Sequence, residues 1–156
     1  MTQRLKNFLI DANSKDFATK NGIKMHALLQ HVVVDDICYG DCEITDIIKK
    51  RSDLRPFFVS SAKTEVPIAG FINNHFVSRR IDRLLINNTT KTIDFIDYKT
   101  DINKNEFVEK YKKQLNEYAQ LLKSAYPEYK INGYILWLND WGLEPVVKTK
   151  GVKHEK

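Results

Sequence analysis

An apolar run that ends in a carboxylate and an ammonium group, residues 93–100, constrains this chain more than any other segment. Its aromatic and β-branched residues predict a strand. Successive strand side chains point to opposite faces, so Asp97 and Lys99 share a face with Ile93 and Phe95. The strand therefore starts on a packed surface and presents an Asp-x-Lys pair at its end. Such a pair is suited to phosphodiester chemistry, in which a carboxylate holds a divalent cation and the lysine offsets developing charge.

A second carboxylate is predicted to lie close to the first. Asp82 falls in another strand-like run, residues 77–86, and Thr89 with its polar neighbours makes the turn between the two runs. Two consecutive antiparallel strands would bring Asp82 near Asp97. Oxygen ligands from neighbouring strands suit Mg²⁺ or Mn²⁺.

Two helices are expected to flank these strands. Residues 23–34 carry apolar side chains at helical spacing, and His26 lies at the edge of that apolar face. The strongest helical pattern covers residues 105–125, where an apolar residue recurs every three or four positions. Gln114 and Tyr118 are four residues apart on it and therefore lie on one face. Tyr111 on the same helix has the pattern of a core aromatic.

The remaining pattern predicts a small mixed sheet in an α/β fold. Residues 35–42 are expected to form a loop around Gly40, and residues 44–51 a short helix capped by Thr45. Turns are expected at Gly70 and at Asn73–Asn74. Further strands are expected at residues 62–68, 75–86, 91–98 and 131–138.

Five motifs follow one another at plausible spacing, and together they resemble a known family. They are Gly22-x-x-x-His26, Glu65-Val66-Pro67-Ile68, Ile81-Asp82-Arg83-Leu84, Asp97-Tyr98-Lys99-Thr100 and Gln114-Leu115-x-x-Tyr118, with Leu136-Trp137 near the end. The order resembles the RecB-like branch of the PD-(D/E)xK nuclease superfamily. Within that branch it is most similar to the C-terminal nuclease domain of AddA-type subunits of helicase–nucleases. The similarity covers roughly Gly22 to Trp141 and implies a restriction-endonuclease-like core.

The resemblance implies a role for each matching residue. His26, Asp82 and Asp97, with the backbone carbonyl of Tyr98, would hold Mg²⁺ or Mn²⁺. Lys99 would orient water or stabilise the phosphorane, and Gln114 would align these groups. Tyr118 would contact the substrate backbone or support the metal-bound groups, whereas Glu65 is equally well an extra acid or a strand-edge carboxylate. The implied activity is that of a deoxyribonuclease in double-strand break repair and recombination, with exonuclease action favoured over endonuclease action.

One position departs from the family pattern. The family usually places a small residue two positions before the aspartate of the Asp82 motif, and this chain has Arg80 there. A guanidinium at this point could grip DNA, or it could mark a weakened active site. The alternative function is therefore a catalytically weak DNA-binding or docking module that partners a separate helicase. A metal-independent structural domain would leave the clustered motifs unexplained.

Charge and composition are consistent with a polyanionic partner. The 156-residue chain has a formal net charge of +5 and a sequence pI of about 9.1. Arg79, Arg80 and Arg83 bracket Asp82, and a lysine cluster precedes Gln114: Lys110, Lys112 and Lys113. We expect DNA to be that partner. No phosphate-binding loop of the G-x-x-x-x-G-K-[ST] type occurs in this sequence, so it contains no motor. Because an AddA-type subunit would carry a helicase in the same chain, the sequence is a separate gene product, a fragment or an excised domain, and a helicase subunit is a candidate partner.

The remaining features bound the organisation and compartment. Length and apolar content predict one domain over residues 1–147, followed by a basic tail at 148–156 that is expected to be disordered. Cys38 and Cys42 are too few to build an iron–sulfur cluster alone and are expected to be reduced thiols. With no membrane span or signal peptide in the pattern, we expect a cytoplasmic protein without a membrane partner. The sequence leaves open strand polarity, strandedness and oligomeric state.

Overall fold

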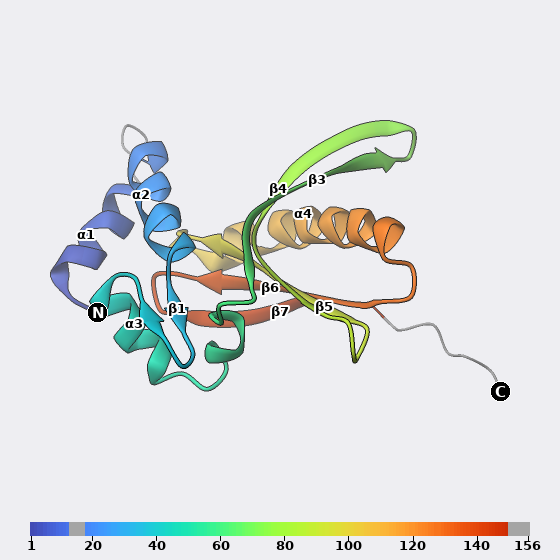
Figure 1. The fold of residues 1–156 in the computed structure, drawn as a ribbon. Helices are drawn as coiled ribbons and strands as arrows, with labels where there is room; N and C mark the ends of the chain where they lie inside the picture. The colour runs from blue at the N-terminus through green and yellow to red at the C-terminus, as the bar shows by residue number, and fades with distance from the viewer. Residues whose placement is uncertain (13–17, 150–156) are drawn as a thin grey trace.

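The computed structural model describes residues 1–12 and 18–149 (Figure 1). The helices are α1 (Gln3–Ala12), α2 (Ala18–Gln30), α3 (Cys42–Lys49), the short 3-10 helix η1 (Arg55–Phe57) and α4 (Lys104–Ala125). The strands are β1 (Val33–Val34), β2 (Cys38–Tyr39), β3 (Lys63–Ile72), β4 (His75–Asn87), β5 (Thr92–Lys99), β6 (Lys130–Trp137) and β7 (Gly142–Lys148). No helix among the described residues is both long enough and apolar enough to cross a membrane.

The main sheet is mixed, as predicted, and has the strand order β3-β4-β5-β6-β7. Strands β5 and β6 are parallel, whereas the other neighbours are antiparallel. Helix α4 supplies the crossover that two consecutive parallel strands require. It packs on one face of the sheet, against Ile93, Phe95 and Ile135, while α2 and α3 pack with Ile96 and Tyr98 of the opposite face. The α/β class is therefore confirmed.

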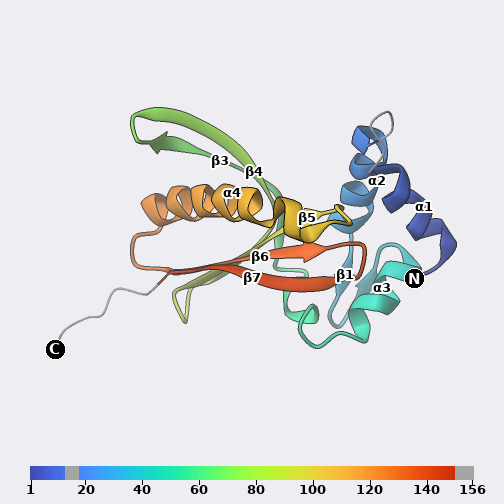
Figure 2. The same ribbon diagram turned by 180° about the vertical axis from the view of Figure 1, so that it is seen from behind.

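Strand β4 changes faces at Asp82. Ile81 and Leu84 belong to the same core beside α4, although regular alternation would place an odd and an even residue on opposite faces. The β3–β4 register passes over Asp82 and the residue opposite it, Glu65, whose φ is +53°. Beyond this kink, β3 and the first half of β4 leave the sheet as a hairpin that arches over α4 (Figures 1 and 2).

The hairpin turn lies at Asn73 and Asn74, as predicted. Their φ angles are +49° and +65°, the pair of left-handed residues that a tight two-residue turn requires. Gly70 lies inside β3 instead of in a turn. A Cβ at this position would come within 2.9 Å of Leu121 Cδ2, so the glycine permits the close approach of β3 to α4.

The elements before β3 differ from those predicted. Helix α2 ends at Gln30, and β1 and β2 pair where the end of the helix and a loop were expected. The amide of Val34 donates to the carbonyl of Phe58, so this residue pairs with a distant segment and does not continue the helix. Helix α3 begins at Cys42, two residues early. Its cap is Asp41, whose carboxylate accepts from the amide of Ile44 at 3.1 Å, and Thr45 lies inside the helix.

The elements from β3 onward lie close to their predicted positions, with one addition. Strand β7 was not predicted, because its glutamate, proline and lysine obscure the strand pattern. It ends at Lys148, and the amide of Thr149 still donates to the carbonyl of Ile131. The rest of the predicted tail, residues 150–156, lies outside the described residues.

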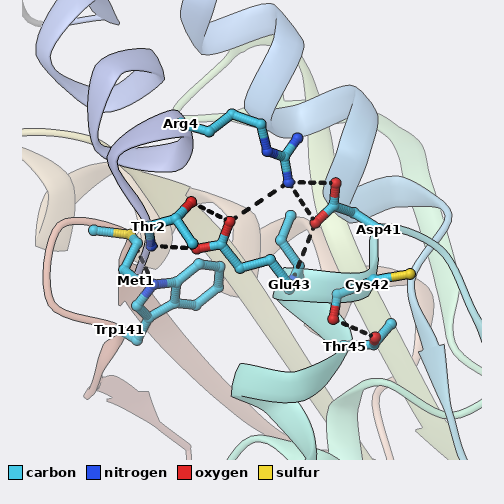
Figure 3. Close-up of polar contacts among 9 residues, drawn as sticks. Met1, Thr2, Arg4, Asp41, Cys42, Glu43, Thr45 and Trp141 are labelled. Carbon is cyan, nitrogen blue, oxygen red and sulfur yellow. Dashed lines mark hydrogen bonds and ion pairs between the residues drawn. The ribbon is translucent and has the colours of Figure 1, made fainter.

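Polar contacts tie the N-terminal segment to α3 (Figure 3). Arg4 pairs with Asp41 at 2.7 Å, and the backbone amide and hydroxyl of Thr2 both donate to Glu43. The Trp141 indole lies 3.4 Å from the sulfur of Met1. These contacts tie the start of the chain to α3 and to the β6–β7 turn, while α1 itself packs on α2.

Candidate functional site

Asp82 and His26 meet at the kink in β4. The register of β4 with β5 reaches Arg83 opposite Ile96, so Asp82 and Asp97 are the next facing residues, at the point where the pairing stops. Asp82 Oδ2 accepts a hydrogen bond from the Tyr98 amide at 2.7 Å. The same oxygen lies 3.4 Å from His26 Nε2. Two predicted site residues from separate elements are thus brought together.

Asp97 is a buried carboxylate at the end of β5. Its Oδ2 lies 2.9 Å from Lys99 Nζ, but among the described residues no donor approaches that oxygen with hydrogen-bond geometry. Burial, together with the charge of Asp82, raises the pKa of Asp97 to about 6 against the opposing attraction of Lys99. The carboxylate pair therefore carries more negative charge than the lysine offsets.

Lys99 is held from several sides. Its Nζ lies 3.0 Å from Gln114 Oε1 and 4.1 Å from the centre of the Tyr111 ring, a cation–π contact. The Tyr111 hydroxyl donates to Asp101 at 2.5 Å, which fixes the ring. Tyr111 was predicted only as a core aromatic. Its position one turn before Gln114 on α4 was the signal that it shares a face with the site.

The Gln114 side chain continues this chain of contacts into the core. Its Nε2 donates to the Tyr118 hydroxyl at 2.8 Å, and Tyr118 is buried beside Phe95, with ring centres 6.1 Å apart. Burial raises the pKa of Tyr118 well above its usual range. This geometry fits a positioning role for Tyr118, in which the tyrosine orients the amide of Gln114.

Tyr98 faces away from the carboxylates. Its side chain is buried with α2, and its hydroxyl accepts from Arg83 Nε at 3.0 Å. Burial raises the pKa of Tyr98 to about 12, so the hydroxyl stays protonated. The part of Tyr98 that belongs to the site is its backbone, since the amide binds Asp82.

Two open pockets flank the carboxylates. The first, of about 400 Å³, is lined by His26, Ala27, Gln30, Glu65 and Arg80. The second, of about 420 Å³, is lined by Arg79, Lys99, Lys110, Tyr111, Lys113, Gln114 and Glu117. Arg80 is 68% exposed and lies 3.7 Å from Glu65, while Arg79 lies 3.4 Å from Glu117. A larger pocket, of about 560 Å³, lies at Met1 and Trp141, and none of its lining residues belongs to the site.

Arg83 corrects the predicted basic cluster. It is buried, stacks 4.2 Å from the Phe58 ring centre, and donates to the backbone carbonyls of Leu29 and Phe57. The prediction that Arg83 belongs to the DNA-facing charge is therefore wrong. Its bond to Leu29, at 2.7 Å, instead anchors the end of α2 and so positions His26.

The donor set fits a hard divalent cation. An imidazole and two carboxylates, among them the buried Oδ2 of Asp97, are ligands of the type that Mg²⁺ and Mn²⁺ accept. Among the described residues, however, no three His, Cys, Asp or Glu side chains are drawn together closely enough to form a ready-made metal group. Asp97 is turned toward Lys99 instead. Cys38 and Cys42 are exposed thiols on β2 and α3, outside the site.

Comparison with known proteins adds no assignment to this geometry. No protein-family model matches the chain, and a search of curated proteins returned no match.

Proposed function

We propose that this chain is a metal-dependent DNA nuclease of the RecB-like PD-(D/E)xK type, with a restriction-endonuclease-like core. The observation that carries the proposal is the buried carboxylate of Asp97. It faces Asp82 at the end of the β4–β5 pairing, and its buried Oδ2 lies 2.9 Å from the Lys99 ammonium, without a contact of regular hydrogen-bond geometry among the described residues. Two buried carboxylates beside one ammonium group are costly for folding alone, and such groups cluster at functional sites.

In this proposal, His26, Asp82 and Asp97, with the carbonyl of Tyr98, would hold Mg²⁺ or Mn²⁺. The bound cation would lower the pKa of water and withdraw charge from the scissile phosphate. Lys99 then orients the attacking water or meets the charge that develops on the phosphate, because Gln114 and Tyr111 hold its ammonium in one place. Tyr118 keeps the Gln114 amide turned so that its oxygen faces the lysine.

The basic side chains around the site favour a polyanionic substrate. Arg79, Lys110 and Lys113 line the pocket that contains Lys99, and Arg80 lines the pocket that contains His26. Phosphates on either side of the scissile bond would meet positive charge in both pockets. We propose exonuclease action on DNA ends in double-strand break repair and recombination, with a separate helicase chain as partner.

Incubation with end-labelled linear DNA and closed circular DNA tests this proposal. Linear DNA should be degraded with Mg²⁺ or Mn²⁺ and remain intact in EDTA. Lys99→Ala should abolish cleavage, while Lys49→Ala, at an exposed lysine of α3, should leave it unchanged. Cleavage of the circle would indicate an endonuclease. Equal cleavage by wild type and Lys99→Ala, in a preparation free of other nucleases, would contradict the proposed site.

A second candidate function is a DNA-binding or docking module with weak catalysis. It is favoured by Arg80, which faces Glu65 in the pocket of His26, and by the lack of a ready-made metal group among the described residues. DNA binding without cleavage at any concentration of Mg²⁺ or Mn²⁺ would support this candidate over the first.

A further inference from the structure

The hairpin of β3 and β4 has an uncovered face, which we call the hairpin outer face. The register pairs Pro67 with Arg80, Ala69 with Ser78 and Phe71 with Phe76, and directly opposite residues of a sheet share a face. All six residues are exposed. The other face of the hairpin packs on α4, and no described helix or strand lies beyond the outer side of the arch (Figures 1 and 2).

The far end of the hairpin outer face is aromatic. Phe71 is 73% exposed and Phe76 is 65% exposed, and their rings meet edge to face with centres 5.7 Å apart. Two adjacent exposed phenylalanines contribute none of the free energy that burial of their apolar surface would give. Exposed apolar patches of this kind mark interaction sites. The fixed edge-to-face pair presents a rigid aromatic surface to that partner.

The near end of the hairpin outer face carries Arg80, which lies 3.7 Å from Glu65, and this end adjoins the proposed site. Arg80 is 68% exposed and lines the same pocket as His26, which contacts Asp82. The two residues between these ends, Ala69 and Ser78, have small side chains, so nothing projects from the hairpin outer face between Arg80 and the phenylalanines. Four residues of strand separate Arg80 from Phe76, which is about 13 Å, or the length of about four stacked bases.

We propose that the hairpin outer face binds single-stranded DNA next to the scissile bond, with bases stacked on Phe71 and Phe76 and a phosphate on Arg80. The proposal rests on the proposed nuclease function and adds its substrate form. A duplex keeps its base faces stacked inside, whereas an unpaired strand can lay them on aromatic rings. Arg80 at the near end of the hairpin outer face and the net charge of +5 favour a polyanionic partner over an apolar one.

Binding measured in EDTA separates this surface from catalysis. Fluorescence anisotropy would compare a labelled oligo-dT with a duplex of the same length. The double variant Phe71→Ala/Phe76→Ala should bind the single strand about tenfold or more weakly, since loss of base stacking has effects of this size. Tyr39→Ala is the matched control, because Tyr39 is an aromatic with 65% exposure on β2. It should bind as wild type does.

A second variant reads out the stacking directly. Phe76→Trp keeps an aromatic ring, so it should retain affinity, and its indole fluorescence should be quenched when oligo-dT binds but not when the duplex binds. A melting curve shows that each variant is folded. Retained affinity with no quenching would place the bases elsewhere and overturn the proposal.

Several results would overturn the assignment of this face. The first is a double variant whose affinity for the single strand lies within twofold of that of wild type. The second is a double variant that loses as much affinity for the duplex as for the single strand. The third is a double variant that binds DNA as wild type does and differs from it only in self-association or in binding to phosphatidylcholine vesicles. Any of these together with Lys99-dependent cleavage leaves the nuclease proposal standing. Stacking on Phe76 without cleavage under any metal would instead support the surface and contradict the nuclease.

Discussion

Replacing Asp97 by asparagine should make the metal-free protein more stable at neutral pH while abolishing cleavage. The carboxylate is buried, and burial raises its pKa to about 6 from an ordinary value of 3.8. The folded chain therefore holds this proton more tightly than the unfolded chain does. The stability that the group contributes is present in full below about pH 4 and is lost as the pH rises through about 6.

The size of the effect follows from the pKa. A rise from 3.8 to about 6 corresponds to about 3 kcal/mol by which the ionised carboxylate lowers the free energy of unfolding. Asparagine has a similar shape and no charge, so it would recover up to that amount above pH 6. Lys99 loses an ion pair in the variant but keeps Gln114 and the Tyr111 ring. For a chain of 156 residues, about 3 kcal/mol is a rise of at most about 6–12 °C in Tm.

Thermal melts between pH 4 and pH 8, with and without Mg²⁺, measure the effect. In EDTA, wild type and Asp97→Asn should have similar Tm values near pH 4 and should separate as the pH rises, with the variant higher. Saturating Mg²⁺ should raise the Tm of wild type, because a ligand that binds only the folded chain stabilises it by about 2.7 kcal/mol at one hundred times Kd. The variant should gain much less.

Two results would refute this reasoning. A variant less stable than wild type at pH 8 in EDTA would mean that the ion pair of Asp97 with Lys99 stabilises the fold by more than burial of the carboxylate destabilises it. Asp97 would then be a structural residue and not a metal ligand. An equal Mg²⁺-induced rise in both proteins would mean that the cation binds elsewhere. Asp53→Asn, at an exposed aspartate that pairs with Arg51, serves as the control for a general effect of removing a carboxylate.

Three further predictions concern neighbouring residues. Arg80→Gly should weaken DNA binding and reduce the slope of log K against log salt by about one, as anisotropy over a salt series would show; an unchanged slope would remove the phosphate contact. Tyr111→Leu, which removes the ring over Lys99 and the bond to Asp101, should lower kcat more than it changes KM, whereas a pure rise in KM would indicate a substrate contact. Arg83→Met should lower stability by about 3 kcal/mol or more, because buried carbonyls lose their donor; a melting curve like that of wild type would contradict this.

The local part of the candidate site could be predicted from the sequence. Alternation along one strand places Asp97 and Lys99 on the face of Phe95, and the structure has Lys99 beside Gln114 on that face. The short connection between β4 and β5 makes them antiparallel neighbours, which brings Asp82 opposite Asp97. Both inferences depend only on the period of a strand and the length of a turn.

Long-range contacts explain what the sequence did not predict. The apolar spacing of Val32 and Val33 continues the helical pattern, but the Val34 amide pairs with Phe58, far along the chain, and the helix ends at Gln30. Arg79, Arg80 and Arg83 look alike as charges in the sequence, and only the packing of α2 decides which is buried. The kink at Asp82 leaves no local signal, because Glu65, opposite it, is not a residue type that favours a positive φ.

That kink explains how neighbouring residues of β4 come to hold the same helix in two ways. Arg83 turns to the face of α2 and donates to the carbonyls of Leu29 and Val32, at the helix end where carbonyl groups lack partners within the helix. Asp82, one residue earlier, meets His26 from the preceding turn of that helix. Regular alternation would send these two side chains to opposite faces. Because alternation breaks here, Arg83 anchors the end of α2 while Asp82 contacts His26 on the same helix. The position of His26 therefore depends on Arg83.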